Sequence, residues 1–471
     1  MRAQSSRLYE YLPRPLQTVA VSSIGWRIRR ERYGGTFPSL LRDYVSRDRA
    51  SEDEILAVRR MKLRRLLAHA RAEIPYWSRT LRAFDIDPER IEGPDDLASL
   101  PILTKADVLR LGSDLRWSSA PRSELRTVHT SGTTGAGLVF ATTIEAQRDQ
   151  WAVWWRFRKR HALELDTWHA MFMGWTIVPS SNIDSRPWRT NWPGRQVFFS
   201  QYHLSPATAP GYAGALDRMA LPWFHGYPSV VSYLASLILD AGRPSLRPRV
   251  VSLGAENVLP SQVRVIREAF GVEPISHYGL AEMVANASQC PNGRLHIDED
   301  FAAVELVPVG DGTVRIVGTS LGNRAMPFIR YDTGDLAVVF PSKCGCGLPG
   351  RVLERIDGRQ EDFIELNDGT LVGRADHLFK DAVRVAEAQI RQTQPGSCEI
   401  VVVPRDGFGA SDEAAILQEC ESRFGDRLEV KVRCVESIAR TSRGKLRLVV
   451  RERADTAHLR EDAHTGGEAG V

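Results

Sequence analysis

The chain has 471 residues, of which 43% are hydrophobic and 25% charged, and its formal net charge is +4. This length exceeds what one hydrophobic core usually supports, so the sequence predicts a globular enzyme of at least two domains. No apolar run is long enough for a transmembrane helix, and the stretch Leu16 to Trp26 is too interrupted for a secretory signal. Six dispersed cysteines are typical of a reducing compartment, so we expect a cytoplasmic protein.

The positive charge is concentrated at the N-terminus. Residues 1–35 contain seven arginines and two glutamates, a net of +5, so the remainder sums to about −1. This distribution excludes a general nucleic-acid-binding surface. We predict a basic arm over residues 1–50, either simply solvated or in weak contact with an anionic membrane surface, since aromatic and apolar residues interleave with the arginines.

A large layered α/β domain is predicted over residues 51–357. Ser51 and Glu54 form a capping box that opens a helix. Trp151, Trp154 and Trp155 have helical spacing, which is more typical of core than of a ligand site.

The second half of this domain shows the clearest alternation. We expect a buried strand over Val250–Leu253, a helix over Ser261–Phe270 capped by Ser261, and a strand over Pro274–Tyr278. Such alternation favours a layered α/β sheet. Residues 302–340 instead predict consecutive antiparallel strands.

Residues 358–453 are predicted to form a small, mobile α+β lid domain. The expected elements are a hairpin over 363–372, a helix over 376–391, a strand over Cys398–Val403, a helix over 412–423 and a strand over Leu428–Val435. Residues 454–471 have few large apolar side chains and are predicted to be a disordered tail.

The loop Thr130–Gly137 has the composition of a phosphate-binding segment. Its three glycines free the backbone to turn N–H groups toward an anion, and its hydroxyls can donate to phosphate oxygens. It is not a Walker loop, because the chain contains no Gly-Lys-Ser/Thr triplet. An ordinary Ser/Thr/Gly surface loop has the same composition, so this alternative stays open.

Three further polar positions are each ambiguous when taken alone. Glu282 follows a predicted strand end, where α/β sheets bind ligands, and could hold Mg²⁺. Asp335 follows a turn and could accept hydrogen bonds from ribose hydroxyls, while Lys445 lies on a glycine-containing loop. The occurrence of all these motifs in this order along the chain indicates function more strongly than any one of them alone.

Together these motifs resemble the adenylate-forming superfamily of acyl-CoA synthetases. The resemblance extends over about residues 50–450. It rests on Thr130–Gly137, Gly254-Ala255-Glu256, Tyr278–Glu282, Tyr331–Asp335, Gly358-Arg359 and Thr441–Lys445. Leu100–Lys105 and Cys344–Gly347 resemble the phenylacetate–CoA ligase family in particular. Gly226–Ser229 and Glu387–Gln392 resemble its branch associated with capsular polysaccharide biosynthesis.

The resemblance implies an adenylate-forming fold and specific roles for these residues. Thr130, Ser131, Gly132, Thr133, Thr134 and Gly135 would hold the phosphates of ATP, and Gly254, Ala255, Glu256, Tyr278 and Gly279 would hold adenine. Glu282 would ligate Mg²⁺, Asp335 and Arg359 would hold the ribose, Lys445 would be catalytic, and Glu361 would be the hinge.

Two departures from the family pattern concern phosphate and acceptor binding. Ala136 replaces the lysine usual after the last glycine of the phosphate loop. The segment 364–369 lacks the pattern that normally lines the CoA tunnel, so the resemblance supports adenylation more strongly than a CoA acceptor.

A separate signal comes from the cysteines. Cys290 and His296 precede the pair Cys344 and Cys346, and each pair lies at a glycine-containing turn. Three thiolates and one imidazole form a closed, structural Zn²⁺ site in many proteins. The alternative is three reduced cysteines and a surface histidine.

The preferred function is therefore the ATP-dependent activation of a carboxylic acid as acyl-AMP, followed by transfer to CoA. One alternative is acyl or amide transfer to a glycan or small metabolite, and another is a non-catalytic nucleotide-binding partner of a polysaccharide assembly complex. The identity of the acid is not encoded in any motif. The candidate pocket residues are Trp175, His225, Tyr227 and His277.

Overall fold

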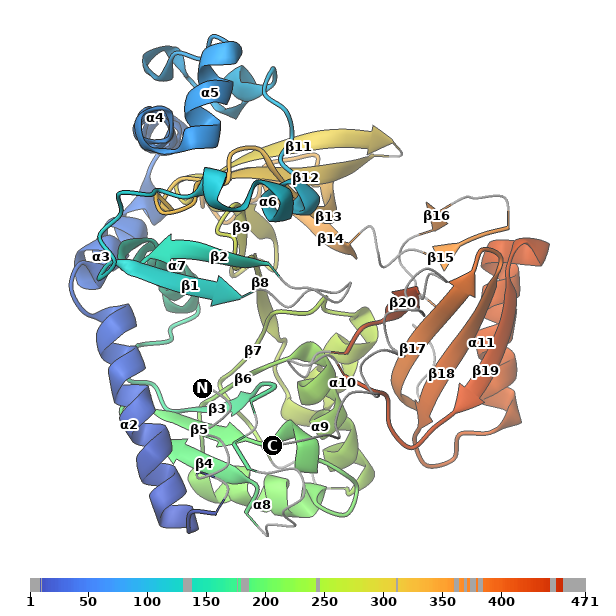
Figure 1. The fold of residues 1–471 in the computed structure, drawn as a ribbon. Helices are drawn as coiled ribbons and strands as arrows, with labels where there is room; N and C mark the ends of the chain where they lie inside the picture. The colour runs from blue at the N-terminus through green and yellow to red at the C-terminus, as the bar shows by residue number, and fades with distance from the viewer. Residues whose placement is uncertain are drawn as a thin grey trace, which may run out of the picture.

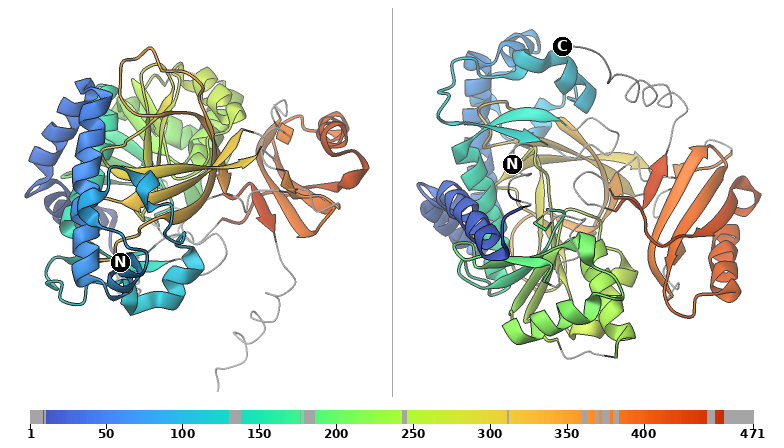
Figure 2. Two further views of the ribbon diagram at one scale, coloured as in Figure 1. Left: turned by 90° about the horizontal axis from the view of Figure 1, so that it is seen from above. Right: turned by 60° about the horizontal axis from the view of Figure 1, so that its bottom comes forward.

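The computed structural model describes residues 9, 11–129, 138–175, 177–178, 186–242, 246–310, 312–359, 364–367, 371–372, 378–379, 384–440 and 446–451. Within these ranges the chain forms a large N-terminal domain and a small C-terminal domain beside it (Figure 1). Both views in Figure 2 show the small domain, in orange and red, projecting from the large one as a separate body.

The first described segment is mainly helical. Its helices are α2 (Arg14–Tyr33), α3 (Phe37–Ser46), α4 (Glu52–Glu73), α5 (Pro75–Ala83) and α6 (Lys105–Leu111). Helix α4 has the predicted capping box, in which the Ser51 hydroxyl accepts from the Glu54 N–H and the Glu54 carboxylate accepts from the Ser51 N–H. None of the helices in the described ranges is long and apolar enough to cross a membrane.

Residues 14–46 are packed against the domain and do not form a solvated arm. Ser22 donates from Oγ to the carbonyl of Thr190 at 3.2 Å, and Arg29 donates from Nη1 to the carbonyl of Pro193 at 2.9 Å. A Cβ on Gly25 would lie 2.0 Å from the Asn191 side chain, so α2 can approach this segment only with glycine there. The prediction of a solvated arm is wrong for these residues, because polar contacts and the close approach at Gly25 hold α2 against residues 190–193, and the buried side chains of Phe37, Leu41 and Tyr44 anchor α3.

One twelve-stranded sheet forms the centre of the large domain, in the order β11-β12-β13-β14-β10-β9-β8-β7-β6-β3-β5-β4. Strands β3 (His169–Phe172), β5 (Gln196–Phe199), β6 (Trp223–Gly226), β7 (Val250–Leu253) and β8 (Ile275–Gly279) are parallel, and β4 (Trp188–Asn191) is an antiparallel edge. The predicted strands at 250 and 275 are confirmed.

The two faces of the parallel strands are covered by different elements. Helices α8 (Ala209–Met219), α9 (Pro228–Asp240) and α10 (Pro260–Phe270) share a hydrophobic core with Phe224 of β6. Trp223 of the same strand belongs to the other core, together with Trp155 of α7 (Ile144–Arg160). Side chains that alternate along a strand point to opposite faces, which explains this division.

Helix α10 begins one residue earlier than predicted. Its N-cap is Leu259 and not Ser261, with Pro260 in the first turn and the Gln262 side chain accepting from the Leu259 N–H at 3.0 Å. Proline is favoured at the first helical position because its φ is already helical and it has no N–H to satisfy.

The rest of the sheet is antiparallel, as predicted for residues 302–340. It contains β9 (Asn286–Gln289), β10 (Leu295–Ile297), β11 (Ala302–Gly310), β12 (Thr313–Ser320), β13 (Tyr331–Val339) and β14 (Val352–Arg359). A separate two-stranded sheet joins β1 (Leu125–His129) to β2 (Val139–Thr143).

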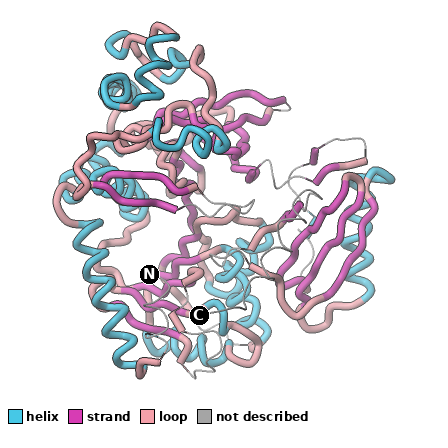
Figure 3. The backbone as a smooth tube through the Cα atoms, viewed as in Figure 1, coloured by secondary structure: helices cyan, strands magenta, loops and turns pink. Residues whose placement is uncertain are grey.

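The small domain has its own sheet (Figure 3), with the strand order β19-β18-β17-β20. It also has its own hydrophobic core. Its elements are β15 (Ile364–Glu365), β16 (Leu371–Val372), β17 (Val385–Gln394), β18 (Ser397–Pro404), α11 (Ala410–Phe424), β19 (Glu429–Cys434) and β20 (Val449–Arg451). The predicted hairpin, the strands at 398 and 428 and the helix at 412 are confirmed.

The predicted helix over 376–391 is wrong, because residues 385–394 form the strand β17. This strand lies inside the sheet between β18 and β20, with Ala388 and Ile390 buried. The Glu/Ala/Gln-rich sequence has high helix propensity, but pairing on both sides and alternate burial decide the conformation.

Candidate active site

The candidate site lies at the carboxyl ends of three neighbouring parallel strands. The sheet register pairs Gly226 with Leu253 and Leu253 with Ser276, so β6, β7 and β8 end at one edge. The segments that follow β7 and β8 are Gly254-Ala255-Glu256 and Leu280-Ala281-Glu282. The topology therefore brings two of the predicted motifs together where α/β sheets bind ligands.

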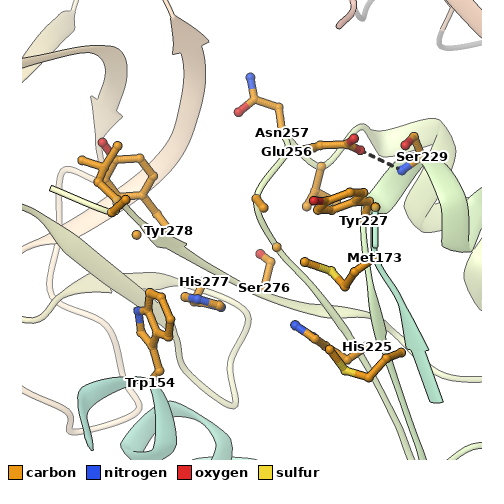
Figure 4. Close-up of a pocket in the computed structure, with 18 of the residues that line it drawn as sticks. Trp154, Met173, His225, Tyr227, Ser229, Glu256, Asn257, Ser276, His277 and Tyr278 are labelled. Atoms are coloured by element: carbon orange, nitrogen blue, oxygen red, sulfur yellow. Dashed lines mark hydrogen bonds between the residues drawn. The ribbon is translucent and has the colours of Figure 1, made fainter. Parts of the chain in front are cut away.

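A cavity of about 1810 Å³ opens at this edge. It extends between the parallel strands on one side and helices α2 and α7 on the other, and residues 385–388 and 446–448 of the small domain also line it. Figure 4 shows Tyr278 and Glu256 on opposite sides of the cavity, with Ser276 and His277 between them in this view.

Glu256 is held by hydrogen bonds from both domains. Its Oε2 accepts from the Ser229 N–H at 3.1 Å, and its Oε1 accepts from the Leu446 N–H at 2.9 Å. Burial raises the pKa of the Glu256 carboxyl above its usual value, although these hydrogen bonds oppose the shift. The preceding Ala255 has a φ of 69°, a left-handed conformation that marks a sharp turn after β7.

Tyr278 and Asp335 are directly bonded. The Tyr278 hydroxyl donates to Asp335 Oδ2 at 2.6 Å, and both residues line the cavity. Asp335 pairs with Arg359 in the β13–β14 register, so the backbone brings these two predicted residues side by side. The Arg359 side chain lies outside the described part of the structure.

Gly279 and Glu282 also border the cavity. A Cβ on Gly279 would lie 2.8 Å from the Asn286 side chain and 3.1 Å from Trp154 Nε1, so the packing leaves room only for glycine. Glu282 is buried, and the next residue, Met283, has a φ of 61°. This turn places a carboxylate at the end of β8, where it could contribute a ligand to a divalent cation.

Several predicted residues lie outside the described residues. They are Thr130, Ser131, Gly132, Thr133, Thr134, Gly135, Glu361 and Lys445. Two described residues close to these segments, Val128 of β1 and Leu446, line the cavity.

The predicted acid-pocket residues Trp175, His225, Tyr227 and His277 all line the cavity. Burial lowers the pKa of His277 to about 3 and that of His225 well below its usual value, so both rings are neutral near pH 7. The hydrogen bond between His225 Nδ1 and Ser252 Oγ, 2.8 Å long, orients the His225 ring.

The sequence interpretation missed the cavity-facing side of α7. Trp155 is buried as predicted, but Trp151, Trp154, Trp155 and Arg158 all border the cavity. Trp154 is oriented by a 2.9 Å hydrogen bond from its Nε1 to Asn286 Oδ1. The available signal was Arg158, which continues the tryptophan stripe at helical spacing and is unusual in a purely apolar core face.

The predicted metal ligands converge on one point and do not themselves line the cavity. One ligand atom from each of Cys290, His296, Cys344 and Cys346 lies within 4.8 Å of the others. The His296 Nδ1 lies 3.1 Å from the Pro349 carbonyl, which leaves Nε2 facing Cys346 Sγ at 3.3 Å. Backbone N–H groups of Arg294 and Leu348 donate to Cys290 and Cys346, an arrangement that stabilises thiolates.

Comparisons with known proteins agree with this arrangement. Residues 365–452 match the family described as the CapK C-terminal domain. The phenylacetate–coenzyme A ligase of Thermus thermophilus is 25% identical over 397 residues, covering 79% of this chain and 83% of that protein. Protein CapK of Staphylococcus aureus is 21% identical over 452 residues, covering 94% of this chain and 98% of that protein.

A crystal structure of a 2-hydroxyisobutyryl-CoA ligase in the postadenylation state superimposes with a TM-score of 0.66 at 19% identity, covering 89% of this chain and 94% of that one. The fold is therefore that of the adenylate-forming CoA ligases, which confirms the predicted fold class. Within that class the chain is similar to phenylacetate–CoA ligases and to CapK, as the sequence motifs indicated.

Proposed function

We propose that this protein is an AMP-forming acid ligase. In the first half-reaction a carboxylate oxygen attacks the α-phosphorus of ATP, and pyrophosphate leaves to give the acyl-AMP. The observation that supports this most directly is the convergence of Glu256, Glu282 and the Tyr278–Asp335 pair on one cavity, in a fold shared with adenylate-forming CoA ligases.

The proposed roles of the residues follow from their positions. Backbone groups of 254–256 and 279, with the Tyr278 ring, would bind adenine, and Asp335 with Arg359 would bind the ribose. Glu282 would hold Mg²⁺, which would offset the negative charge of the triphosphate. Residues 130–135 would bind the triphosphate itself. Lys445 would stabilise the negative charge that develops as the carboxylate attacks phosphorus.

The position of Lys445 relative to the cavity would depend on the orientation of the small domain. The next residue, Leu446, is bonded to Glu256 at the cavity edge, which supports an arrangement suited to adenylation. We propose that the small domain then rotates about Glu361, so that the second half-reaction takes place at the same acyl-AMP.

The acceptor in the second half-reaction is proposed to be CoA. Its thiolate would attack the acyl carbon and release AMP, giving a thioester. The similarity to CapK, and the altered segment 364–369, favour a second candidate in which a glycan or small metabolite accepts the acyl group. Product analysis with and without CoA distinguishes these candidates, since adenylate that accumulates without forming thioester would contradict the CoA assignment.

We further propose that Cys290, His296, Cys344 and Cys346 bind one structural Zn²⁺. Four ligands leave no open position for a substrate. None of the six cysteines, all of which the structure describes, forms a disulfide, and together with their dispersed pattern this supports the proposal of a reducing, cytoplasmic location.

Pyrophosphate exchange into ATP across a panel of carboxylic acids tests the proposed function, because it reports adenylation without an acceptor. Lys445→Ala should reduce the exchange rate about 10²- to 10³-fold, as expected for a lost transition-state contact. Lys431→Ala, at an exposed position on β19, is the matched control. Exchange unchanged in Lys445→Ala would remove that residue from catalysis, and no exchange with any acid would favour a non-catalytic nucleotide-binding partner.

A further inference from the structure

The part of the cavity that lies away from the nucleotide motifs contains a buried arginine enclosed by tryptophans. Arg158 of α7 is 5% exposed and lines the cavity. Its guanidinium carbon lies 5.6 Å from the ring centroid of Trp151, 5.0 Å from that of Trp155 and 5.7 Å from that of Trp223. Cation–π contacts of this kind stabilise the charge only partly, and they leave the N–H donors at the edge of the guanidinium unused.

No carboxylate among the described residues pairs with Arg158, and its Nη1 atom is buried without a hydrogen-bond partner there. Arg156, two residues earlier on the same helix, is equally buried but pairs with Asp298 at 2.6 Å and Asp300 at 2.8 Å. Burial accordingly lowers the pKa of Arg158 to about 10, whereas the two aspartates raise that of Arg156. Among the described residues, the fold therefore supplies carboxylate counter-ions to Arg156 but not to Arg158.

A second cation strengthens the positive charge at this place. Arg32 of α2 also lines the cavity, lies 4.2 Å from the centroid of Trp151, and forms no ion pair within the described chain. The proximity of Arg32 contributes to the lowered pKa of Arg158, so the two positive charges repel each other.

Two neutral histidines line the cavity near this arginine. His169 of β3 stacks on Trp223 at 4.0 Å, and burial lowers its pKa to about 3. His277 directly precedes Tyr278, and its Nδ1 is buried without a hydrogen-bond partner among the described residues. The same cavity thus borders Tyr278, at the nucleotide end, and the Arg158 guanidinium.

Burying an unpaired charge costs free energy that a bound anion would recover. We infer that the acid activated by this protein carries a second anionic group, a carboxylate or a phosphate, that binds Arg158 between the tryptophan rings. This inference rests on the proposed function, because it identifies the substrate class of the same cavity. The first carboxylate would face the nucleotide, and the second anion would accept hydrogen bonds from the guanidinium.

Direct binding tests this inference without requiring turnover. The probes are α,ω-dicarboxylic acids of graded length, ω-phosphono carboxylic acids of the same lengths, and the half methyl ester of each diacid. Binding is followed by tryptophan fluorescence, because three tryptophans surround Arg158, and by calorimetry. Wild-type protein should bind the best diacid or phosphono acid about 10- to 100-fold more tightly than the matching ester. The more tightly bound series identifies the second anion.

Arg158→Met should abolish this preference, while Arg158→Lys should retain part of it. Arg324→Met is the matched control, since Arg324 lies 5.2 Å from the Trp117 ring centroid outside the cavity. Equal binding of diacid and ester, no binding of any dianion, or a preference that survives in Arg158→Met would overturn the inference. If Arg158→Met does not fold, the inference is still tested by comparing diacid with ester binding in the wild type and in Arg158→Lys.

Pyrophosphate exchange with the same acids separates the two proposals. Dianion binding that depends on Arg158 without exchange would contradict adenylation but support the anion site. Exchange with monocarboxylic acids alone would support adenylation and overturn the anion site.

Discussion

The backbone N–H of Leu446 donates to Glu256 Oε1 at 2.9 Å, a contact that joins residues 190 positions apart and links the two domains. Two side-chain contacts reinforce this link. Arg440 Nη1 donates to Ser229 Oγ at 2.9 Å, and Arg405 pairs with Asp240 at 2.5 Å. Glu256 therefore belongs both to the loop after β7 and to the surface on which the small domain is held.

We predict that Glu256→Gln slows adenylation about tenfold or more. The two carboxylate oxygens accept from different N–H groups, and a glutamine offers only one oxygen, so its amide N–H₂ would face a donor. Pyrophosphate exchange measures the effect, and Glu273→Gln at the exposed ion pair with Arg267 is the control. An exchange rate equal in both variants would show that the Leu446 contact does not position the loop containing Lys445.

The second prediction concerns the nucleotide. Asp335→Asn should raise KM for ATP about tenfold, because the neutral amide accepts more weakly and loses the charge-assisted bond from Tyr278. Tyr278→Phe should raise KM for ATP less than Asp335→Asn does, since it leaves the Asp335 carboxylate in place. Asp332→Asn, in the same strand but bonded to Arg315, is the control. An unchanged KM in Asp335→Asn would place the ribose elsewhere.

The sequence predicted those parts of the fold and candidate site whose signals are local. Val250–Leu253 is a short, mainly apolar run, and Ile275–Gly279 is a short mixed segment that follows Pro274. The motifs after these two segments could be placed at strand ends without knowing the sheet order. The capping box at Ser51 is equally local. These elements needed no long-range information.

The wrong or missed predictions concern segments whose conformation or surroundings depend on tertiary contacts. Residues 385–394 have a helix-favouring composition but form a strand, because they pair on one side with the adjacent β18 and on the other with β20, where Ile390 lies opposite Val449. Spacing alone places Arg158 on the tryptophan face of α7, but it could not show that this face borders a cavity, because the surroundings of Arg158 come from α2, β3, β6 and β8. Whether a buried arginine pairs with a carboxylate also depends on the assembled fold, as the difference between Arg156 and Arg158 shows.

The third prediction concerns acid stability. Burial holds the pKa of His169 and His277 at about 3 and that of His225 well below its usual value, whereas unfolded histidine titrates near pH 6.5. The folded state therefore binds fewer protons below about pH 6.5, and the free energy of unfolding falls as pH decreases toward 3. Each such histidine contributes a slope of up to about 1.4 kcal/mol per pH unit.

Denaturant unfolding at several pH values between neutrality and mild acid measures this slope. His169→Gln should reduce it by about 1.4 kcal/mol per pH unit relative to wild type. His129→Gln, at an exposed position on β1, should leave it unchanged. Equal slopes in wild type and His169→Gln would mean that His169 is not kept neutral by the fold.

The last prediction is that purified protein contains close to one Zn²⁺ per chain, bound by Cys290, His296, Cys344 and Cys346. The ligand atoms lie within 4.8 Å of one another before any rearrangement, and the Pro349 carbonyl fixes the histidine tautomer so that Nε2 faces the thiols. The ligand pairs flank strands β11 to β13, so a metal would close a long loop in the unfolded chain. By the relation used for cross-links, such closure contributes about 4 kcal/mol.

Cys344→Ser combined with Cys346→Ser should therefore release the metal and lower the melting temperature, with activity lost in proportion to folded protein. Cys434→Ser, at an exposed thiol on β19, should retain both metal and stability. Elemental analysis of protein prepared without chelators gives the stoichiometry, and added zinc should raise the melting temperature of chelator-treated wild type but not of the double variant. Wild-type protein that lacks zinc and melts at the same temperature as the double variant would show that these residues are ordinary reduced cysteines beside a histidine.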